Sequence, residues 1–194
     1  MNSADAPRFF DIEKNVKEYI AMREGLDGRY LIDILRNYLK SNSTILELGM
    51  GPGMDLDILR GYFEAAGSDA SGIFIDLYKK DNPNADVLVL DAASLETDRK
   101  FDCLFSNKVL HHLTRDQLEI SFSRQYEILN DRGLLFHTFW EGDAENEYLD
   151  LRFIKYRIPQ LVKATSALFE LLESGSYAEM NLNDSFYLIM RKRS

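Results

Sequence analysis

The sequence predicts an α/β protein built on a doubly wound, mostly parallel, seven-stranded sheet, with an antiparallel C-terminal hairpin and an N-terminal helical cap. Three observations predict this class. Short apolar runs alternate with helical stretches between residues 44 and 140, which is typical of a parallel sheet covered by helices on both faces. One of these runs leads straight into a glycine-rich loop at residues 49–53. Two apolar runs near the end of the chain lie close enough in sequence to pair as a hairpin.

The chain has 194 residues, which is enough for one buried α/β core and too few for two comfortable domains. We therefore expect a single domain that spans the whole chain. Its three parts are expected to be a helical cap, a sheet core and a segment that ends in the hairpin, at residues 1–43, 44–140 and 141–194.

Apolar residues at helical spacing predict two helices before the first strand. Ile12, Val16 and Ile20 mark the first helix, and residues 31–39 mark the second. A break between Gly25 and Gly28 separates them.

The core is expected to contain five strands, at residues 44–49, 64–69, 86–91, 101–106 and 133–140. The helices that connect them are expected at residues 56–62, 72–80 and 114–129. Thr114 and Gln117 form a capping-box pair at the start of the last helix. Residues 130–133 are turn formers that lead into the fifth strand.

Beyond residue 140 the sequence predicts an acidic loop, an extended piece, a short helix that begins at Pro159, and the two strands of the hairpin. Apart from the helix, their expected ranges are 141–147, 151–156, 167–172 and 185–190.

Charge and composition exclude several kinds of partner. The chain carries 23 Lys and Arg against 32 Asp and Glu, a formal net charge of −9, so it repels a phosphate backbone and we expect no nucleic acid partner. It has no run of about 18 apolar residues, and residues 1–10 lack a secretory signal. The single cysteine, Cys103, excludes an internal disulfide. We therefore expect a cytoplasmic protein with no membrane partner.

The glycine-rich loop indicates a ligand site. Gly49, Gly51 and Gly53 follow a strand at alternate positions, and a helix start is expected at residue 55 or 56. Glycines allow positive φ and remove the β-carbons that would hold a bulky ligand away from the main chain. The sequence therefore predicts a ligand that lies against this backbone.

The residues around the loop indicate which ligand fits. A dinucleotide fingerprint needs a glycine at the sixth position, and counted from Gly49 that position is Met54. Glu47 precedes the loop and Asp55 stands at the helix start, and neither carboxylate favours a diphosphate. Both suit a ligand with an ammonium group and a positively charged sulfonium.

This segment resembles the first motif of class I S-adenosylmethionine-dependent methyltransferases of the small-molecule type. Similar motifs follow in order at Asp69, Asp91 and Asn107, and the tail at residues 183–188 looks like the closing hairpin of that family. The resemblance implies a Rossmann-like fold and a methyltransferase that uses S-adenosylmethionine and releases S-adenosylhomocysteine.

The resemblance also implies roles for single residues. It places Asp69 on the ribose hydroxyls and Asp91 on the adenine amino group. Both residues end strands, and in a doubly wound sheet ligands bind outside the carboxyl ends of the strands. The expected cofactor-binding residues are Glu47, Gly49, Met50, Gly51, Gly53, Asp69, Ala70, Asp91, Ala92 and Asn107.

Two histidines are the candidate catalytic residues. His111 and His112 lie just past Asn107, nearest to the expected reactive edge, where either could take a proton from an acceptor. Adjacent residues on a helix point about 100° apart, so we expect at most one of them to face the pocket. His137 is expected to be a core residue, and the three histidines lack the spacing of a metal site.

The acceptor is expected to be a small molecule. Nucleic-acid amino-methylating enzymes of this superfamily carry an Asn/Asp-Pro-Pro-aromatic run at the fourth strand, whereas residues 106–109 here are Ser-Asn-Lys-Val. The resemblance suggests that the N-terminal helices fold over the pocket. There Tyr19 or Arg23 could reach the cofactor's carboxylate, although packing and surface roles are the expectation for both. The aromatic residues that could line an acceptor site are Phe139, Trp140, Tyr148, Phe153 and Tyr156.

Other functions remain open at this point. A nicotinamide-dependent oxidoreductase is one, although Met54 opposes it, and a non-catalytic protein that binds S-adenosylmethionine is another. A protein or peptide acceptor also fits, because an acidic surface attracts basic targets. The sequence does not distinguish a monomer from a homodimer.

Overall fold

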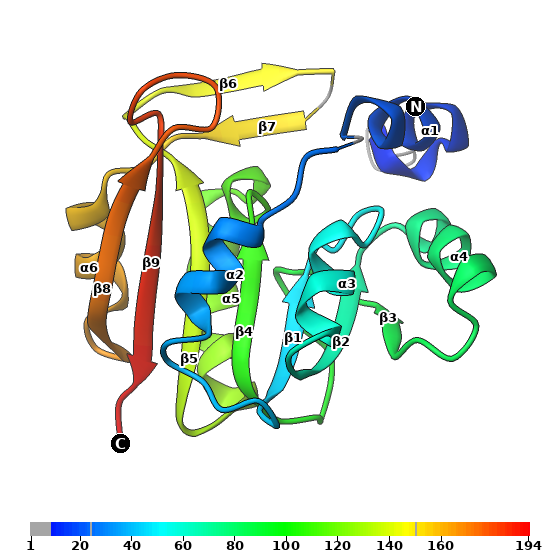
Figure 1. The fold of residues 1–194 in the computed structure, drawn as a ribbon. Helices are drawn as coiled ribbons and strands as arrows, with labels where there is room; N and C mark the ends of the chain where they lie inside the picture. Colours follow the sequence, from blue (N-terminus) through cyan, green and yellow to red (C-terminus); the bar gives the residue numbers. More distant parts are fainter. Residues whose placement is uncertain (1–8, 24, 150) are drawn as a thin grey trace.

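The main sheet of the computed structural model has seven strands in the order β3-β2-β1-β4-β5-β9-β8 (Figure 1). The structure describes residues 9–23, 25–149 and 151–194, so part of the expected cap lies outside the described residues. The strands are β1 (Thr44–Leu48), β2 (Glu64–Asp69), β3 (Val87–Val89), β4 (Phe101–Asn107), β5 (Leu129–Trp140), β8 (Phe169–Tyr177) and β9 (Ser185–Lys192). The first five are parallel and β9 runs antiparallel between β5 and β8, which confirms the predicted class and the hairpin.

Helices pack against both faces of this sheet. They are α1 (Glu13–Arg23), α2 (Arg29–Leu35), α3 (Met54–Arg60), α4 (Gly72–Asp81), α5 (Arg115–Ile128) and α6 (Ile158–Thr165), with short 3₁₀ turns η1 (Phe9–Asp11) and η2 (Leu110–His112). Leu46 and Leu104 share one apolar core with α5 and α6, whereas Ile45 and Phe105 share another with α2 and α3. Successive strand residues therefore supply opposite faces, as a sheet buried on both sides requires.

One expected loop contains a strand. The acidic segment at 141–147 overlaps β6 (Glu145–Tyr148), which pairs with β7 (Leu151–Ile154) in a separate antiparallel hairpin. All four β6 residues are exposed, so no alternation of apolar and polar residues marks the strand in the sequence. Figure 1 shows this hairpin above the carboxyl ends of the main sheet.

Several element boundaries differ from the expected ones. Helix α2 ends at Leu35 rather than at residue 39, α3 begins at Met54, and β3 ends before Asp91. The turn expected at 130–133 is an irregularity inside β5, where the Asn130 side chain donates a hydrogen bond to Asp102 Oδ1 at 2.8 Å. Tertiary pairing thus decides the ends of these elements.

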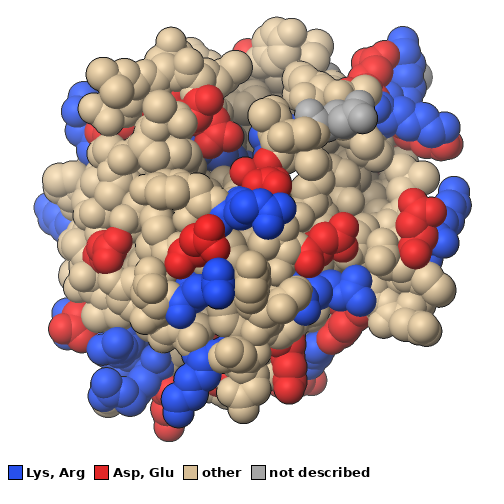
Figure 2. Space-filling model, viewed as in Figure 1, with Lys and Arg blue, Asp and Glu red and all other residues tan. Residues whose placement is uncertain are grey.

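Charged side chains of both signs are interspersed over the face shown in Figure 2. This face carries no broad field of one sign, although the chain as a whole is acidic. Within the three described ranges, no helix has the length and apolar character that crossing a bilayer requires.

A buried polar chain joins the sheet to α5. His137 on β5 lies 2.8 Å from Ser106 Oγ through Nδ1 and 2.7 Å from Gln125 Oε1 through Nε2. Because an amide oxygen only accepts, Nε2 carries the proton and Nδ1 accepts from Ser106. Gln125 in turn donates to Ser121. This arrangement supports the expected core role of His137.

We predict that His137→Gln reduces the acid sensitivity of the fold. Burial lowers the pKa of His137 to about 3, whereas the unfolded chain titrates near the ordinary value of about 6.5. Protons therefore favour the unfolded state between these values, and His137 should lower the free energy of unfolding by up to about 1.4 kcal/mol per pH unit below pH 6.5. Urea unfolding of both proteins at pH 7.0, 5.5 and 4.5 measures this, and identical pH slopes would contradict it.

Candidate functional site

A cleft lies where the chain order of the sheet reverses, between the carboxyl ends of β1 and β4. In doubly wound sheets this switch point is where ligands bind. Ten residues line the cleft: Tyr19, Arg23, Glu47, Gly49, Met50, Gly51, Pro52, Met54, Asp55 and Asn107. The glycine loop, the start of α3, the end of β4 and the cap helix α1 therefore meet at one place.

The three loop glycines serve different purposes, although all have positive φ. A Cβ on Gly49 would come within 2.6 Å of Val109, and one on Gly53 within 2.3 Å of the Tyr78 ring. A Cβ on Gly51 would meet only the Tyr19 ring, at 3.8 Å. Gly49 and Gly53 are thus required by the packing of the protein itself, whereas Gly51 leaves the backbone bare toward the cleft.

Glu47 brings an uncompensated carboxyl group to the cleft. Its side chain is 3% exposed, and Oε2 has no hydrogen-bond partner among the described residues. Burial, together with the neighbouring carboxylates of Asp55 and Asp69, raises the pKa of Glu47 well above its ordinary value. A ligand with a positive charge would stabilise the ionised form, so the site favours a cation.

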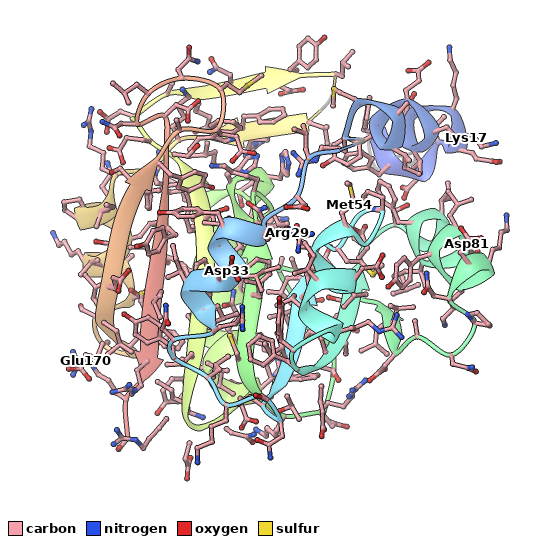
Figure 3. All side chains as sticks on the ribbon, in the orientation of Figure 1. Lys17, Arg29, Asp33, Met54, Asp81 and Glu170 are labelled. Carbon is pink, nitrogen blue, oxygen red and sulfur yellow. The ribbon has the colours of Figure 1, made fainter. Side chains whose placement is uncertain are left out.

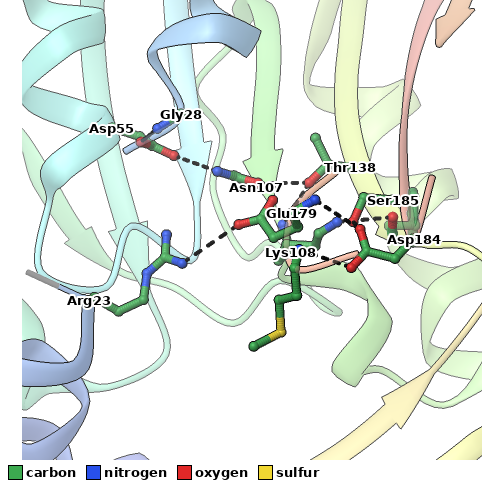
Figure 4. A network of polar contacts seen from close by, with 11 residues as sticks. Arg23, Gly28, Asp55, Asn107, Lys108, Thr138, Glu179, Asp184 and Ser185 are labelled. Carbon is green, nitrogen blue, oxygen red and sulfur yellow. Dashed lines mark hydrogen bonds and ion pairs between the residues drawn. The ribbon is translucent and has the colours of Figure 1, made fainter. Parts of the chain in front are cut away.

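Asp55 connects the cleft to its surroundings (Figure 4). Its Oδ1 accepts the Gly28 N–H at 2.5 Å, and its Oδ2 accepts from the Asn107 amide at 3.0 Å. The Asn107 oxygen accepts from Thr138 Oγ1 at 2.9 Å. The starts of α2 and α3 are thereby tied to the ends of β4 and β5.

Helix α1 closes the cleft from above. Its Tyr19 ring lies edge-on to Phe74 with centroids 5.9 Å apart, and Arg23 lies 3.9 Å from Glu179 on the loop between β8 and β9. Figure 3 shows Met54 at the start of α3, on the side toward α1. The enclosed space is only about 40 Å³, enough for a few water molecules. In this conformation α1 therefore limits the space in the cleft.

The structure brings together half of the predicted cofactor-binding residues. Those that line the cleft are Glu47, Gly49, Met50, Gly51 and Asn107, and those outside its lining are Gly53, Asp69, Ala70, Asp91 and Ala92.

Asp69 accepts the N–H of Gly51 at 3.0 Å and of Ser71 at 2.8 Å, so it fixes the glycine loop against β2. Asp91 is exposed and accepts the Ala93 N–H at 2.7 Å in the turn after β3.

The two candidate catalytic histidines lie on η2, beneath the β6–β7 hairpin, and neither lines the cleft. His112 Nδ1 is 2.6 Å from the Arg152 carbonyl oxygen, so Nδ1 donates and Nε2 is the acceptor. His111 is 1% exposed, and neither ring nitrogen has a partner within the described part of the chain. Burial lowers the pKa of both imidazoles, which keeps them neutral.

The helical spacing of apolar residues in the sequence does not identify Tyr19 and Arg23 as cleft residues. Both were expected to serve packing, and both line the cleft. The only signal was their position on a helix before the first strand, because the approach of α1 to the glycine loop is a long-range contact. Pro52 and Met54 flank the glycines and follow from the loop itself.

Comparisons with known proteins agree with this geometry. Residues 45–133 match a family model described as a methyltransferase domain. A Burkholderia thailandensis 1,6-didemethyltoxoflavin-N1-methyltransferase, solved with 1,6-didemethyltoxoflavin and S-adenosylhomocysteine, is 17% identical with a TM-score of 0.78, over 100% of this chain and 93% of that chain.

Two further structures have the same fold. The N-methyltransferase NodS from Bradyrhizobium japonicum, in complex with S-adenosylhomocysteine, is 13% identical with a TM-score of 0.72, over 94% of this chain and 98% of that chain. A putative methyltransferase of Haloferax volcanii, solved in complex with the activator Trm112, is 14% identical with a TM-score of 0.80, over 98% of this chain and 100% of that one. At these identities the likeness establishes the fold.

We predict that Asp55→Ala destabilises the protein and loosens the segment before α2. The change leaves the buried Gly28 N–H and the Asn107 amide without their acceptor, which should cost about 2 to 4 kcal/mol. Amide hydrogen exchange should become faster at Gly28. The matched control is Asp57→Ala, two residues further along the same helix. The Asp57 carboxylate is exposed and accepts a hydrogen bond from the Tyr78 hydroxyl. Equal exchange at Gly28 in both variants would contradict the assignment.

Proposed function

We propose that this chain is a class I, S-adenosylmethionine-dependent methyltransferase and that it transfers the methyl group of S-adenosylmethionine to a small-molecule acceptor. The match of residues 45–133 to a methyltransferase domain supports this proposal. One observation carries the proposal: the bare backbone at Gly51 faces a cleft that also contains Glu47, whose Oε2 has no hydrogen-bond partner among the described residues. The Burkholderia structure, which holds 1,6-didemethyltoxoflavin, supports a small-molecule acceptor. A nicotinamide-dependent reaction has no comparable support.

The residues present fit this cofactor. Glu47 and Asp55 supply negative charge for an ammonium group and a sulfonium, which a diphosphate would not tolerate. Gly51 and Met50 supply the backbone against which the ligand lies, and Asn107 closes the cleft at the end of β4. We propose that Asp69 takes the ribose hydroxyls and Asp91 the adenine amino group, with Gly49, Gly53, Ala70 and Ala92 shaping the surrounding turns.

The chain's own residues would act mainly by positioning. The cofactor supplies a methyl group on a positively charged sulfur, which a correctly placed nucleophile displaces directly. The hydrogen bond between Asp55 and Asn107 holds the two sides of the cleft in a fixed relation, and Tyr19 and Arg23 of α1 line it. No side-chain nucleophile is needed.

We propose that His112 takes the acceptor's proton where the acceptor has one to lose. Its Nε2 is unprotonated in the neutral ring, as a general base requires, and its hydrogen bond to the Arg152 carbonyl fixes this tautomer. His111 would orient His112, since the two ring centroids are 3.9 Å apart. Both lie on η2, which directly follows Lys108 and Val109, and both are outside the cleft lining.

We predict that Gly51→Val abolishes most binding of S-adenosylhomocysteine while the fold persists. The new side chain fits the ligand-free protein but fills the space that the ligand needs. Gly25→Val is the matched control, because Gly25 also has positive φ and a Cβ there has nothing within 4 Å. Both variants should lose similar stability, whereas calorimetry should show a large affinity loss in Gly51→Val alone. Unchanged affinity in Gly51→Val would contradict the site.

We predict that His112→Ala lowers turnover by about 100-fold or more, the usual contribution of a general base. Its affinity for S-adenosylhomocysteine should stay within about twofold of the unmodified protein, because His112 does not line the cleft. The assay measures S-adenosylhomocysteine released from a panel of small-molecule acceptors. Normal turnover in the variant would limit His112 to packing.

A further inference from the structure

Lys108 has an unusual backbone for a lysine. It follows Asn107 directly and adopts φ +58°, the left-handed region that residues with a β-carbon rarely enter. Its N–H donates to Thr138 Oγ1 at 2.9 Å, and the same hydroxyl donates to Asn107 (Figure 4). Strained backbone of this kind persists where the surroundings enforce it, and it clusters at functional sites. Lys108 directly follows Asn107, which lines the cofactor cleft, but is not itself part of that lining.

The ammonium group of Lys108 sits between two aromatic rings. Its Nζ is 4.2 Å from the Trp140 ring centroid and 4.9 Å from the Tyr177 ring centroid, and it donates to the Phe139 carbonyl oxygen at 3.1 Å. The rings stabilise the cation but leave its charge formally unpaired. Among the residues that the structure describes, Lys108 forms no ion pair.

The charged groups near Lys108 are engaged elsewhere. Glu179, on the loop between β8 and β9, pairs with Arg23 on α1. Asp184, on the same loop, accepts the N–H groups of Glu179, Met180 and Asn181 at 2.8 to 3.0 Å. On the η2 side, the buried ring of His111 is neutral. Burial outweighs the two nearby carboxylates and lowers the pKa of Lys108 to about 8.

Exposed apolar side chains occur on the two segments that the Arg23–Glu179 pair joins, which we call the apolar rim. One of these segments, the loop between β8 and β9, directly follows Tyr177. Met180 and Leu182, on the loop between β8 and β9, are 81% and 87% exposed, and Leu26, in the link between α1 and α2, is 53% exposed. The Arg23–Glu179 pair joins these two segments. The apolar rim offers surface for the body of a ligand on the loop that begins after Tyr177, whose ring contacts the Lys108 cation.

We propose that Lys108, Trp140 and Tyr177 form the acceptor subsite and that this subsite takes a planar aromatic acceptor carrying a carboxylate or an ionised hydroxyl. The anion pairs with the Lys108 ammonium, and the aromatic body lies along Trp140 and the apolar rim. This inference rests on the proposed methyl transfer, because it assigns the acceptor to the residue that directly follows Asn107 of the cofactor cleft. It adds the chemical class of acceptor, which neither the fold nor the domain match supplies.

Trp140 is the only tryptophan in the chain, so its fluorescence reports on this subsite directly. The first experiment titrates the fluorescence of the protein from pH 6 to pH 10. We expect an inflection near pH 8 as Lys108 loses its proton beside the ring, no inflection in Lys108→Met, and an unchanged inflection in Lys163→Met, which alters an exposed lysine on α6. An inflection that survives in Lys108→Met would overturn the arrangement.

The second experiment measures ligand class in the presence of saturating S-adenosylhomocysteine. The probes are 4-hydroxybenzoate and 2-naphthoate, each compared with its neutral amide by saturation-transfer NMR and by quenching of Trp140. We expect the acids to bind at least about tenfold more tightly than the amides, and Lys108→Met to remove that preference. Lys108→Arg should keep the preference, which separates loss of charge from loss of fold.

The outcomes separate this inference from the proposed function. If S-adenosylhomocysteine binds but the acids show no preference over the amides, the acceptor assignment is wrong and methyl transfer stands. If S-adenosylhomocysteine does not bind the unmodified protein in calorimetry, the proposed function fails and the acceptor assignment fails with it. Preference for the acids that persists in Lys108→Met would also overturn the assignment.

Discussion

One chain of hydrogen bonds holds the site together. It runs from the Gly28 amide through the Asp55 carboxylate and the Asn107 side chain to Thr138, which also accepts the N–H of Lys108. Each member comes from a different element, so the chain fixes the starts of α2 and α3 relative to the ends of β4 and β5. In a partly buried network, each bond also fixes the orientation of the next. The cofactor cleft and the proposed acceptor subsite therefore keep a constant relation to each other.

The charges on the two sides of this chain are opposite. On the α3 side, the cleft contains the carboxyl groups of Asp55 and Glu47, and Glu47 is too buried to ionise easily without a cation. On the other side, Lys108 brings a desolvated positive charge between two aromatic rings. The proposed cationic methyl donor and the proposed anionic acceptor would each meet a group of complementary charge.

The sequence predicts well the features that depend on short-range patterns. Thr114 and Gln117 form the expected capping box at α5, and the strand that leads into the glycine loop is found where its apolar run predicts it. Features that depend on long-range contacts were missed. Strand β6 has no buried residue to mark it in the sequence. Gly49 is required because a Cβ there would clash with Val109, whereas a Cβ on Gly51 would meet only the Tyr19 ring. The aromatic rings beside Lys108 come from β5 and β8, which are distant from it in sequence.

A crystal structure of the protein grown with S-adenosylhomocysteine tests the account most directly. The account predicts electron density for the ligand against the Gly51 backbone, with its amino group near Glu47 and with α1 displaced from its present position over the cleft. Density for the ligand at any other place on the molecule, with Tyr19 still packed against Gly51, would contradict it.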